Sequence, residues 1–155
     1  MKLVFFDPKC PRPYDSRALV AQGLGGTEAT VVRVANALSA EHDVTVLQHN
    51  REHAVEEHGS LRFLPVTQGS SYISRANHVV FIQKAQHITR VARQTRGRLW
   101  LWLHNYLVDE VPYFWQDHFR HRLGIVCVSQ THAEHTRQHI TGLSVNRWSF
   151  GFLER

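Results

Sequence analysis

Cysteine is scarce in this sequence, with only Cys10 and Cys127 among 155 residues. Two cysteines do not make the disulfide framework that small secreted domains depend on. The sequence also lacks any apolar run of the roughly twenty residues needed to cross a bilayer, and its first residues lack the length and cleavage chemistry of a signal peptide. We therefore expect a cytoplasmic protein in a reducing compartment, whose membrane contact is at most peripheral.

Acidic residues are in the minority, with 13 Asp and Glu against 18 Lys and Arg, and there are 12 histidines. This balance favours anionic ligands. The arginines are scattered, and only residues 90–98 are densely basic, which is typical of the solvated face and end of a helix; nucleic-acid binding is not expected. Low-complexity segments and internal repeats are absent. The length predicts a single domain, 1–155, with one core.

Short apolar runs alternate with amphipathic segments along the chain. The runs predict strands at residues 3–6, 43–48, 61–66, 79–83, 99–104 and 125–129, and the amphipathic segments predict helices at 27–40, 85–96, 111–122 and 132–140. This rhythm indicates βαβ units, and therefore an α/β fold with one Rossmann-like, doubly wound parallel sheet of about six strands. In such sheets ligands bind outside the carboxyl ends of the strands, where Asp7, Gln83, His104 and Ser129 are expected to lie. Three prolines predict a long non-helical loop over residues 8–26.

The turn between the first strand and the first long helix contains Gly25, Gly26 and Thr27. Glycines tolerate positive φ and let backbone N–H groups approach a ligand, while Thr27 can cap the helix whose positive end faces the same point. This arrangement suits the diphosphate of a nucleotide or nucleotide sugar. A tight turn without a ligand is the alternative interpretation.

Four segments together carry a resemblance to a known family. They are the opening strand with Asp7 and Pro8, GLGGTE at 23–28 with its helix, LWLWLHN at 99–105, and IVCVSQTHAEH at 125–135. In this order they resemble the N-terminal half of retaining GT-B glycosyltransferases of the group 1 family, which includes transferases of polysaccharide biosynthesis. The resemblance implies an acceptor-side domain of an enzyme that moves a sugar from a nucleotide-diphosphate sugar to a saccharide or lipid-linked acceptor, without a cofactor or metal.

The resemblance also implies roles for individual residues. Gly25 and Gly26 match the turn that approaches the donor diphosphate, and His104 matches a cleft position near the donor sugar, where it is the candidate catalytic residue. A histidine that only caps the end of its strand is the alternative interpretation of His104. Asn105 follows His104 and is expected to contact substrate. Ser129 matches a strand-end position that is either structural or substrate-contacting.

Two acidic residues near the glycine turn have open roles. Asp7 either orients the glycine loop through its backbone amides or initiates a turn before Pro8. Glu28 in the first helical turn would repel a phosphate if it pointed inward, so we expect it to face the acceptor or to stabilise the helix N-terminus. The spacing of His132, His135 and His139 suggests a metal-binding face, but no suitable second shell accompanies it, and no metal is expected.

The family continues into a second domain that grips the donor, and the sequence ending at Arg155 does not include it. We therefore expect the chain to be inactive alone and to work with that domain in cis or in trans. Two alternatives stay open. One is a stand-alone Rossmann-like module that binds a nucleotide or a protein without catalysis, and the other is an interaction fragment that self-associates.

Overall fold

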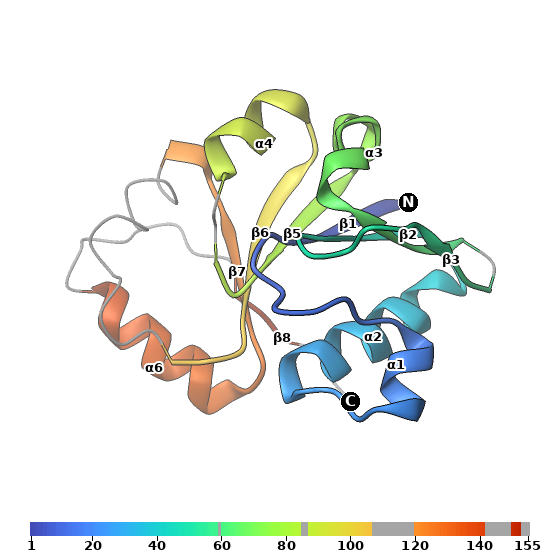
Figure 1. The fold of residues 1–155 in the computed structure, drawn as a ribbon. Coiled ribbons are helices and arrows are strands. Elements are labelled where there is room, and N and C mark those ends of the chain that lie inside the picture. The colour runs from blue at the N-terminus through green and yellow to red at the C-terminus, as the bar shows by residue number, and fades with distance from the viewer. Residues whose placement is uncertain (59, 85–86, 107–119, 142–149, 153–155) are drawn as a thin grey trace.

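The computed structural model describes residues 1–58, 60–84, 87–106, 120–141 and 150–152. The elements in these ranges form an α/β fold around a mostly parallel sheet (Figure 1). The strands are β1 (Lys2–Asp7), β2 (Asp43–Gln48), β3 (Val55–Glu56), β4 (Leu61–Pro65), β5 (His78–Ile82), β6 (Arg98–Leu103), β7 (Gly124–Cys127) and β8 (Phe150–Phe152). The helices are α1 (Ser16–Ala21), α2 (Gly26–Ser39), the 3-10 turn η1 (Val66–Gln68), α3 (Ser70–Arg75), α4 (Ile88–Gln94) and α6 (Gln130–Thr141).

The strand order is β3-β4-β2-β1-β5-β6-β7-β8, and in the described part of the chain only the short β3 runs antiparallel to its neighbour. The chain therefore builds outward from β1 in one direction through β2 and β4, and then returns to add β5, β6 and β7 on the other side of β1. This is the strand order of doubly wound, Rossmann-like sheets. All six predicted strands are present within a residue or two, and their parallel arrangement confirms the predicted fold class at this level.

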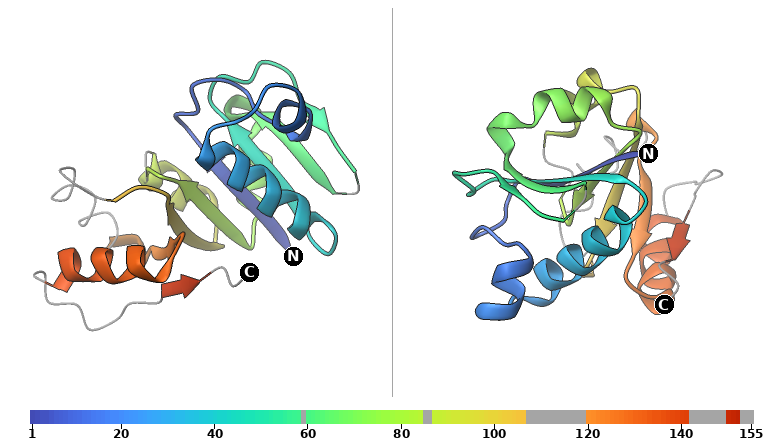
Figure 2. Two further views of the ribbon diagram at one scale, coloured as in Figure 1. Left: turned by 90° about the horizontal axis from the view of Figure 1, so that it is seen from below. Right: turned by 90° about the vertical axis from the view of Figure 1, so that its right-hand side faces the viewer.

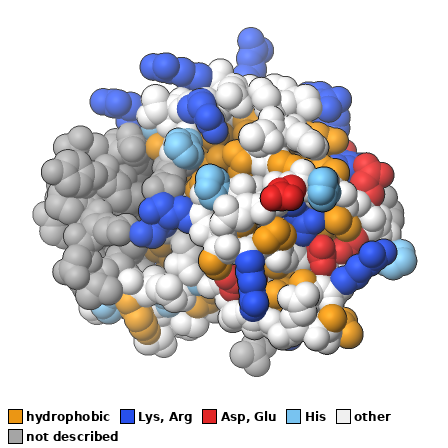
Figure 3. Space-filling model, in the orientation of Figure 1, with side chains coloured by type: hydrophobic (Ala, Val, Ile, Leu, Met, Phe, Trp, Pro, Cys, Tyr) orange, Lys and Arg blue, Asp and Glu red, His pale blue; other side chains and the backbone are white. Residues whose placement is uncertain are grey.

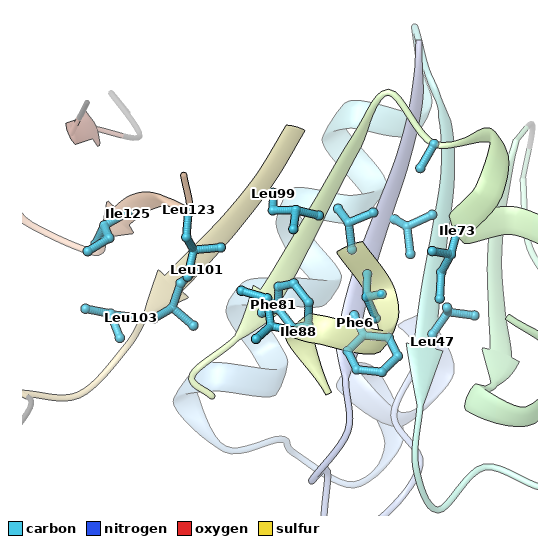
Figure 4. Close-up of a cluster of buried hydrophobic side chains, with 14 of the residues drawn as sticks. Phe6, Leu47, Ile73, Phe81, Ile88, Leu99, Leu101, Leu103, Leu123 and Ile125 are labelled. Carbon is cyan, nitrogen blue, oxygen red and sulfur yellow. The ribbon is translucent and has the colours of Figure 1, made fainter. Parts of the chain in front are cut away.

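The central strands are buried on both faces, as their continuous apolar sequences require. Alternate residues of β1 point to opposite layers: Phe6 joins one hydrophobic cluster and Phe5 joins the other. The first cluster lies under α3 and α4, where Phe81 and Ile88 are fully buried (Figure 4). The second lies under α2. Figure 1 shows α3 and α4 above the sheet with α1 and α2 below it, and Figure 2 shows the same layers from the side.

The predicted loop over residues 8–26 is wrong in its second half, because α1 occupies Ser16–Ala21. The prolines lie before this helix, and the Asp15 side chain caps it by accepting a hydrogen bond from the Ala18 N–H at 3.0 Å. The sequence also did not predict α3, a six-residue helix on the crossover between β4 and β5. Most of the predicted helix 111–122 lies outside the described residues.

Candidate functional site

The candidate site lies at the carboxyl ends of β1, β5 and β6. In doubly wound sheets, ligands bind outside these ends where the strand order reverses, and here the reversal falls between β1 and β5. The N-terminus of α2, which follows β1, is joined to the same edge through side-chain hydrogen bonds. The sequence predicted this edge as the ligand side of the sheet.

Gln83, directly after β5, has a backbone conformation that is rare for a residue with a side chain. Its φ is 61°, and the Lys84 N–H donates to the Ile82 carbonyl across it at 2.6 Å. This is a classic γ-turn, a strained turn that persists where surrounding structure holds it. The Gln83 N–H donates to the Trp102 carbonyl at 2.9 Å, so the turn is fixed to β6. Strain of this kind often marks a functional position.

The side chain of Gln83 connects two residues that the sequence predicted as site residues. Its Nε2 donates to Thr27 Oγ1 at 2.9 Å, and its Oε1 accepts from Asn105 Nδ2 at 3.1 Å. This chain of hydrogen bonds joins the start of α2 to the ends of β5 and β6. The sequence placed Gln83 at this ligand edge, directly after the apolar run VVFI, but predicted no role for it.

His104, the candidate catalytic residue, emerges from the end of β6 and contacts Trp102, with ring centroids 4.5 Å apart. Burial, with a smaller contribution from nearby His132, lowers the pKa of His104 to about 4. Its imidazole is therefore neutral at pH 7. A neutral imidazole offers one donor and one acceptor nitrogen and carries no charge to attract a phosphate.

Three ring nitrogens at this edge are buried and have no hydrogen-bond partner among the described residues: Trp102 Nε1, His104 Nε2 and His132 Nε2. Burial is the main cause of the lowered pKa of His132, and a hydrogen bond with the Asn105 backbone acts in the opposite direction, raising the pKa. Tyr106 covers the outer side of His132, with ring centroids 4.9 Å apart. Buried polar groups are normally paired, so unpaired nitrogens on three neighbouring side chains indicate the position of a ligand or of ordered water.

The glycine turn differs from the prediction in its detailed geometry. Gly25 is the N-cap of α2 with φ −58° and ψ 159°, and Gly26 is the first residue of the helix. The one described glycine with positive φ is Gly23, at 64°. Thr27 is not the cap, since its hydroxyl lies within the first turn and accepts from Gln83. An extended residue before a helix needs no positive φ, so Gly25 and Gly26 do not adopt the conformation that the sequence suggested. Their approach to a diphosphate stays a prediction.

Glu28 lies over the start of α2. A methyl group built on Gly25 would meet Glu28 Oε2 at 2.5 Å, so the carboxylate folds back over the N-cap. This is the helix position from which an acidic side chain stabilises the N-terminus, one of the two roles predicted for it. Its charge also contributes to the raised pKa of Asp7, of which burial is the main cause. An incoming phosphate would therefore meet a carboxylate at this point.

Asp7 holds the proline-rich loop and not the glycine turn. Its carboxylate accepts from the Tyr14 hydroxyl at 2.9 Å and from the Lys9 N–H at 3.4 Å. Gln48 at the end of β2 binds the Tyr14 backbone on both sides, donating to the carbonyl at 2.7 Å and accepting from the N–H at 3.3 Å. Of the two roles predicted for Asp7, initiation of a turn before Pro8 fits the hydrogen bond from the Lys9 N–H. The contacts of Asp7 and Gln48 with Tyr14 fix the loop across the ends of β1 and β2.

Arg51 completes this buried network. It donates to Gln48 Oε1 at 2.8 Å, to the Tyr14 carbonyl at 3.0 Å and to the Asp15 carboxylate at 3.0 Å. Each buried polar group thus has a partner that offsets its desolvation. The sequence did not indicate this network, because its members are separated along the chain.

Ser129 lies beyond β7 and caps α6: its Oγ accepts from the His132 N–H at 3.1 Å. This is a structural contact, and it fixes the helix that carries His132. Within the described part of the chain, no three His, Cys, Asp or Glu side chains are arranged to hold a metal ion; the side chain of His139 lies outside that part. Cys10 and Cys127 are both buried and free. Of the described helices, none has the length and apolar character to cross a membrane.

No protein-family model, curated protein or solved structure matches this chain.

Proposed function

We propose that this chain is the acceptor-side half of a retaining GT-B glycosyltransferase, which transfers a sugar from a nucleotide-diphosphate sugar to a saccharide or lipid-linked acceptor. The observation that carries the proposal is the group of unpaired buried nitrogens on Trp102, His104 and His132. A sugar hydroxyl can donate to one nitrogen and accept from another, whereas an indole N–H requires an acceptor. A ligand rich in hydroxyl groups suits this mixture of donors and acceptors.

The neutral state of His104 defines its role in this proposal. Because its pKa is lowered to about 4, it is a neutral hydrogen-bonding group and only a weak base at pH 7. We assign it to positioning a sugar hydroxyl, next to the polar chain formed by Thr27, Gln83 and Asn105. Orientation of a bound reactant supplies a large part of many rate enhancements, so loss of one positioning group lowers turnover measurably.

In this proposal the donor diphosphate binds at the N-terminus of α2. It can bind there only if the side chain of Glu28 moves away. Its carboxylate covers Gly25, and a phosphate at that point would be repelled. Displacement of Glu28 by the donor, or by the second domain that the proposal requires, is therefore part of the mechanism. We also propose that the protein is cytoplasmic, as the sequence predicts.

The test is sugar transfer from UDP- and GDP-sugars by the product of the complete reading frame that encodes this chain. We expect turnover with at least one donor, and a loss of at least about tenfold for His104→Gln, which corresponds to roughly 1.4 kcal/mol of transition-state stabilisation. The matched control is His58→Gln, an exposed histidine beyond β3, which should leave turnover unchanged.

Two outcomes contradict the proposal. If no donor is turned over, yet a nucleoside diphosphate raises the melting temperature, the chain is a nucleotide-binding module without transferase activity. If turnover is observed and His104→Gln matches the wild type, the assignment of His104 is wrong.

A further inference from the structure

Acidic residues are absent from one long segment of the sequence. Residues 58–108 contain no Asp or Glu, yet they contain six arginines and one lysine. This segment supplies β4, α3, β5, α4 and β6. Its two helices, α3 and α4, cover one side of the sheet, so positive charge is concentrated on that side. This observation does not depend on the proposed transferase activity.

Seven exposed arginines form a surface on α3, α4, the start of β6 and the adjoining turns, which we call the arginine face. It consists of Arg75, Arg90, Arg93, Arg96, Arg98, Arg120 and Arg122. Figure 3 shows Lys and Arg side chains projecting along the upper edge of the molecule, over α3 and α4. Part of this face is hollowed into a groove of about 560 Å³, whose lining includes Arg98, Arg120 and Arg122 and, among the described residues, no acidic side chain.

These arginines are not neutralised within the described part of the chain. The ion pairs found there use Arg51 and Arg62, neither of which belongs to the arginine face. Arg98 is instead held against the ring of Trp100, with its guanidinium carbon 4.2 Å from the ring centroid. The turn with Arg120 and Arg122 is fixed to α4 by a hydrogen bond between Thr89 Oγ1 and His121 Nε2 at 3.3 Å. The face is therefore ordered and positively charged.

The described part of this surface has few exposed apolar groups: Ala92 and Leu99 line part of the groove, and the rings of Tyr72 and Trp100 are only partly exposed. The exposed large hydrophobic residues among those described are Met1, Val20, Tyr106 and Val128, and none belongs to α3, α4 or the adjoining turns. Protein interfaces have an apolar centre, and single-stranded nucleic acids stack on exposed aromatic rings. The rings of Tyr72 and Trp100 lie under guanidinium groups, so this surface favours neither kind of partner.

We propose that the arginine face docks on the surface of a bilayer that contains anionic phospholipids, with arginines paired to lipid phosphates. Guanidinium groups bind phosphate oxygens in a bidentate manner, and each basic residue close to an anionic bilayer increases partition by roughly fivefold. The arginines come from α3, α4, the start of β6 and the adjoining turns, so they form a broad face and not a single projecting helix or ribbon that enters a DNA groove. Docking through the arginine face leaves the candidate site free. The candidate site includes the start of α2, and α2 packs on the side of the sheet opposite α3 and α4.

The experiment measures co-flotation of the protein with vesicles of phosphatidylcholine alone and of phosphatidylcholine mixed with phosphatidylglycerol. The variant replaces Arg90, Arg93 and Arg96 by Gln. The control replaces Arg12, Arg17 and Arg33 by Gln, which removes the same charge from exposed positions in the proline-rich loop, α1 and α2. Circular dichroism verifies that both variants are folded.

We expect binding to the anionic vesicles only, weakening as salt rises, and at least about tenfold weaker binding for the variant of residues 90, 93 and 96 than for the control. Equal binding to both vesicle types, or an equal loss in both triple variants, overturns the proposal, because the effect then depends on net charge or on other surfaces. Binding to duplex DNA at a salt concentration that abolishes vesicle binding also overturns it, in favour of a nucleic-acid partner.

Discussion

Gln83 Nε2 donates a hydrogen bond to Thr27 Oγ1 at 2.9 Å, and these residues lie 56 positions apart in the sequence. The bond joins the first turn of α2 to the strained turn after β5. Because Gln83 also accepts from Asn105, one side chain fixes three elements at the point where the strand order reverses. The hydrogen bonds made by the Gln83 side chain therefore help to hold the Gln83 backbone in its strained conformation.

Two substitutions separate the backbone of Gln83 from its side chain. Gln83→Asn keeps a residue that tolerates positive φ but is too short to bridge Thr27 and Asn105, whereas Gln83→Val places a β-branched residue at φ 61°. We expect Gln83→Val to lower the free energy of unfolding by about 1–3 kcal/mol more than Gln83→Asn does, measured by urea denaturation. Equal destabilisation by the two would show that the turn relaxes at little cost.

The lowered pKa of His104 predicts how stability depends on pH. The pKa is about 4 in the folded protein and 6.5 as the ordinary value, so the unfolded chain binds more protons between these values. The contribution of His104 is fully present above pH 6.5 and is lost as pH falls towards 4. For this half-buried group it amounts to roughly 1–2 kcal/mol after allowance for solvent screening.

Urea unfolding of the wild type and of His104→Gln at several pH values between 4 and 7 measures this contribution. We expect the stability of the variant to fall less steeply with decreasing pH over this window. Asp7, whose pKa is raised, acts in the opposite direction, because its protonation at acid pH favours the folded state. Identical slopes for the two proteins would mean that His104 is not desolvated.

Removing the Tyr14 hydroxyl leaves the buried carboxylate of Asp7 without its side-chain donor. We expect Tyr14→Phe to lower the free energy of unfolding by about 1–3 kcal/mol at pH 7 and to raise the pKa of Asp7 further. The destabilisation should decrease at acid pH, where Asp7 is protonated in both proteins. Carboxyl ¹³C chemical shifts of Asp7 report its titration, and an unchanged pKa in the variant would contradict the hydrogen bond.

The apolar runs of the six parallel strands were sufficient to predict the fold class, because strands buried on both faces have continuous hydrophobic sequences. The short helices α1 and α3 have only six residues each, which is too few for a helical period to be recognised. Of the site, the sequence predicted the edge of the sheet and the residues His104, Thr27 and Asn105. It could not predict Gln83 as their link, since its strained turn depends on contacts made only in the folded chain.

Gly26 offers a direct test of the phosphate-loop hypothesis. Nothing lies within 4 Å of a methyl group built on it, and it is the first residue of α2. Gly26→Ala should therefore raise the free energy of unfolding by up to about 1 kcal/mol through reduced freedom of the unfolded chain. If this turn binds a diphosphate, the same variant should weaken binding of UDP or GDP, measured by calorimetry. A gain in stability with unchanged affinity would identify the turn as structural only.

In this structure the side chain of Glu28 blocks the N-terminus of α2, where an anion would bind. Its carboxylate covers Gly25 and contributes to the raised pKa of Asp7, so Glu28→Gln should lower the pKa of Asp7 and increase the affinity for inorganic phosphate severalfold. The variant should also lose about 0.3–1 kcal/mol of stability, because an acidic residue favours the helix N-terminus. Amide ¹⁵N shifts of residues 25–27 during a phosphate titration locate the anion. The control is Glu41→Gln, an exposed acid beyond α2, which should leave both quantities unchanged. Equal phosphate affinity in wild type and Glu28→Gln, with shifts elsewhere in the chain, would remove α2 from the donor site.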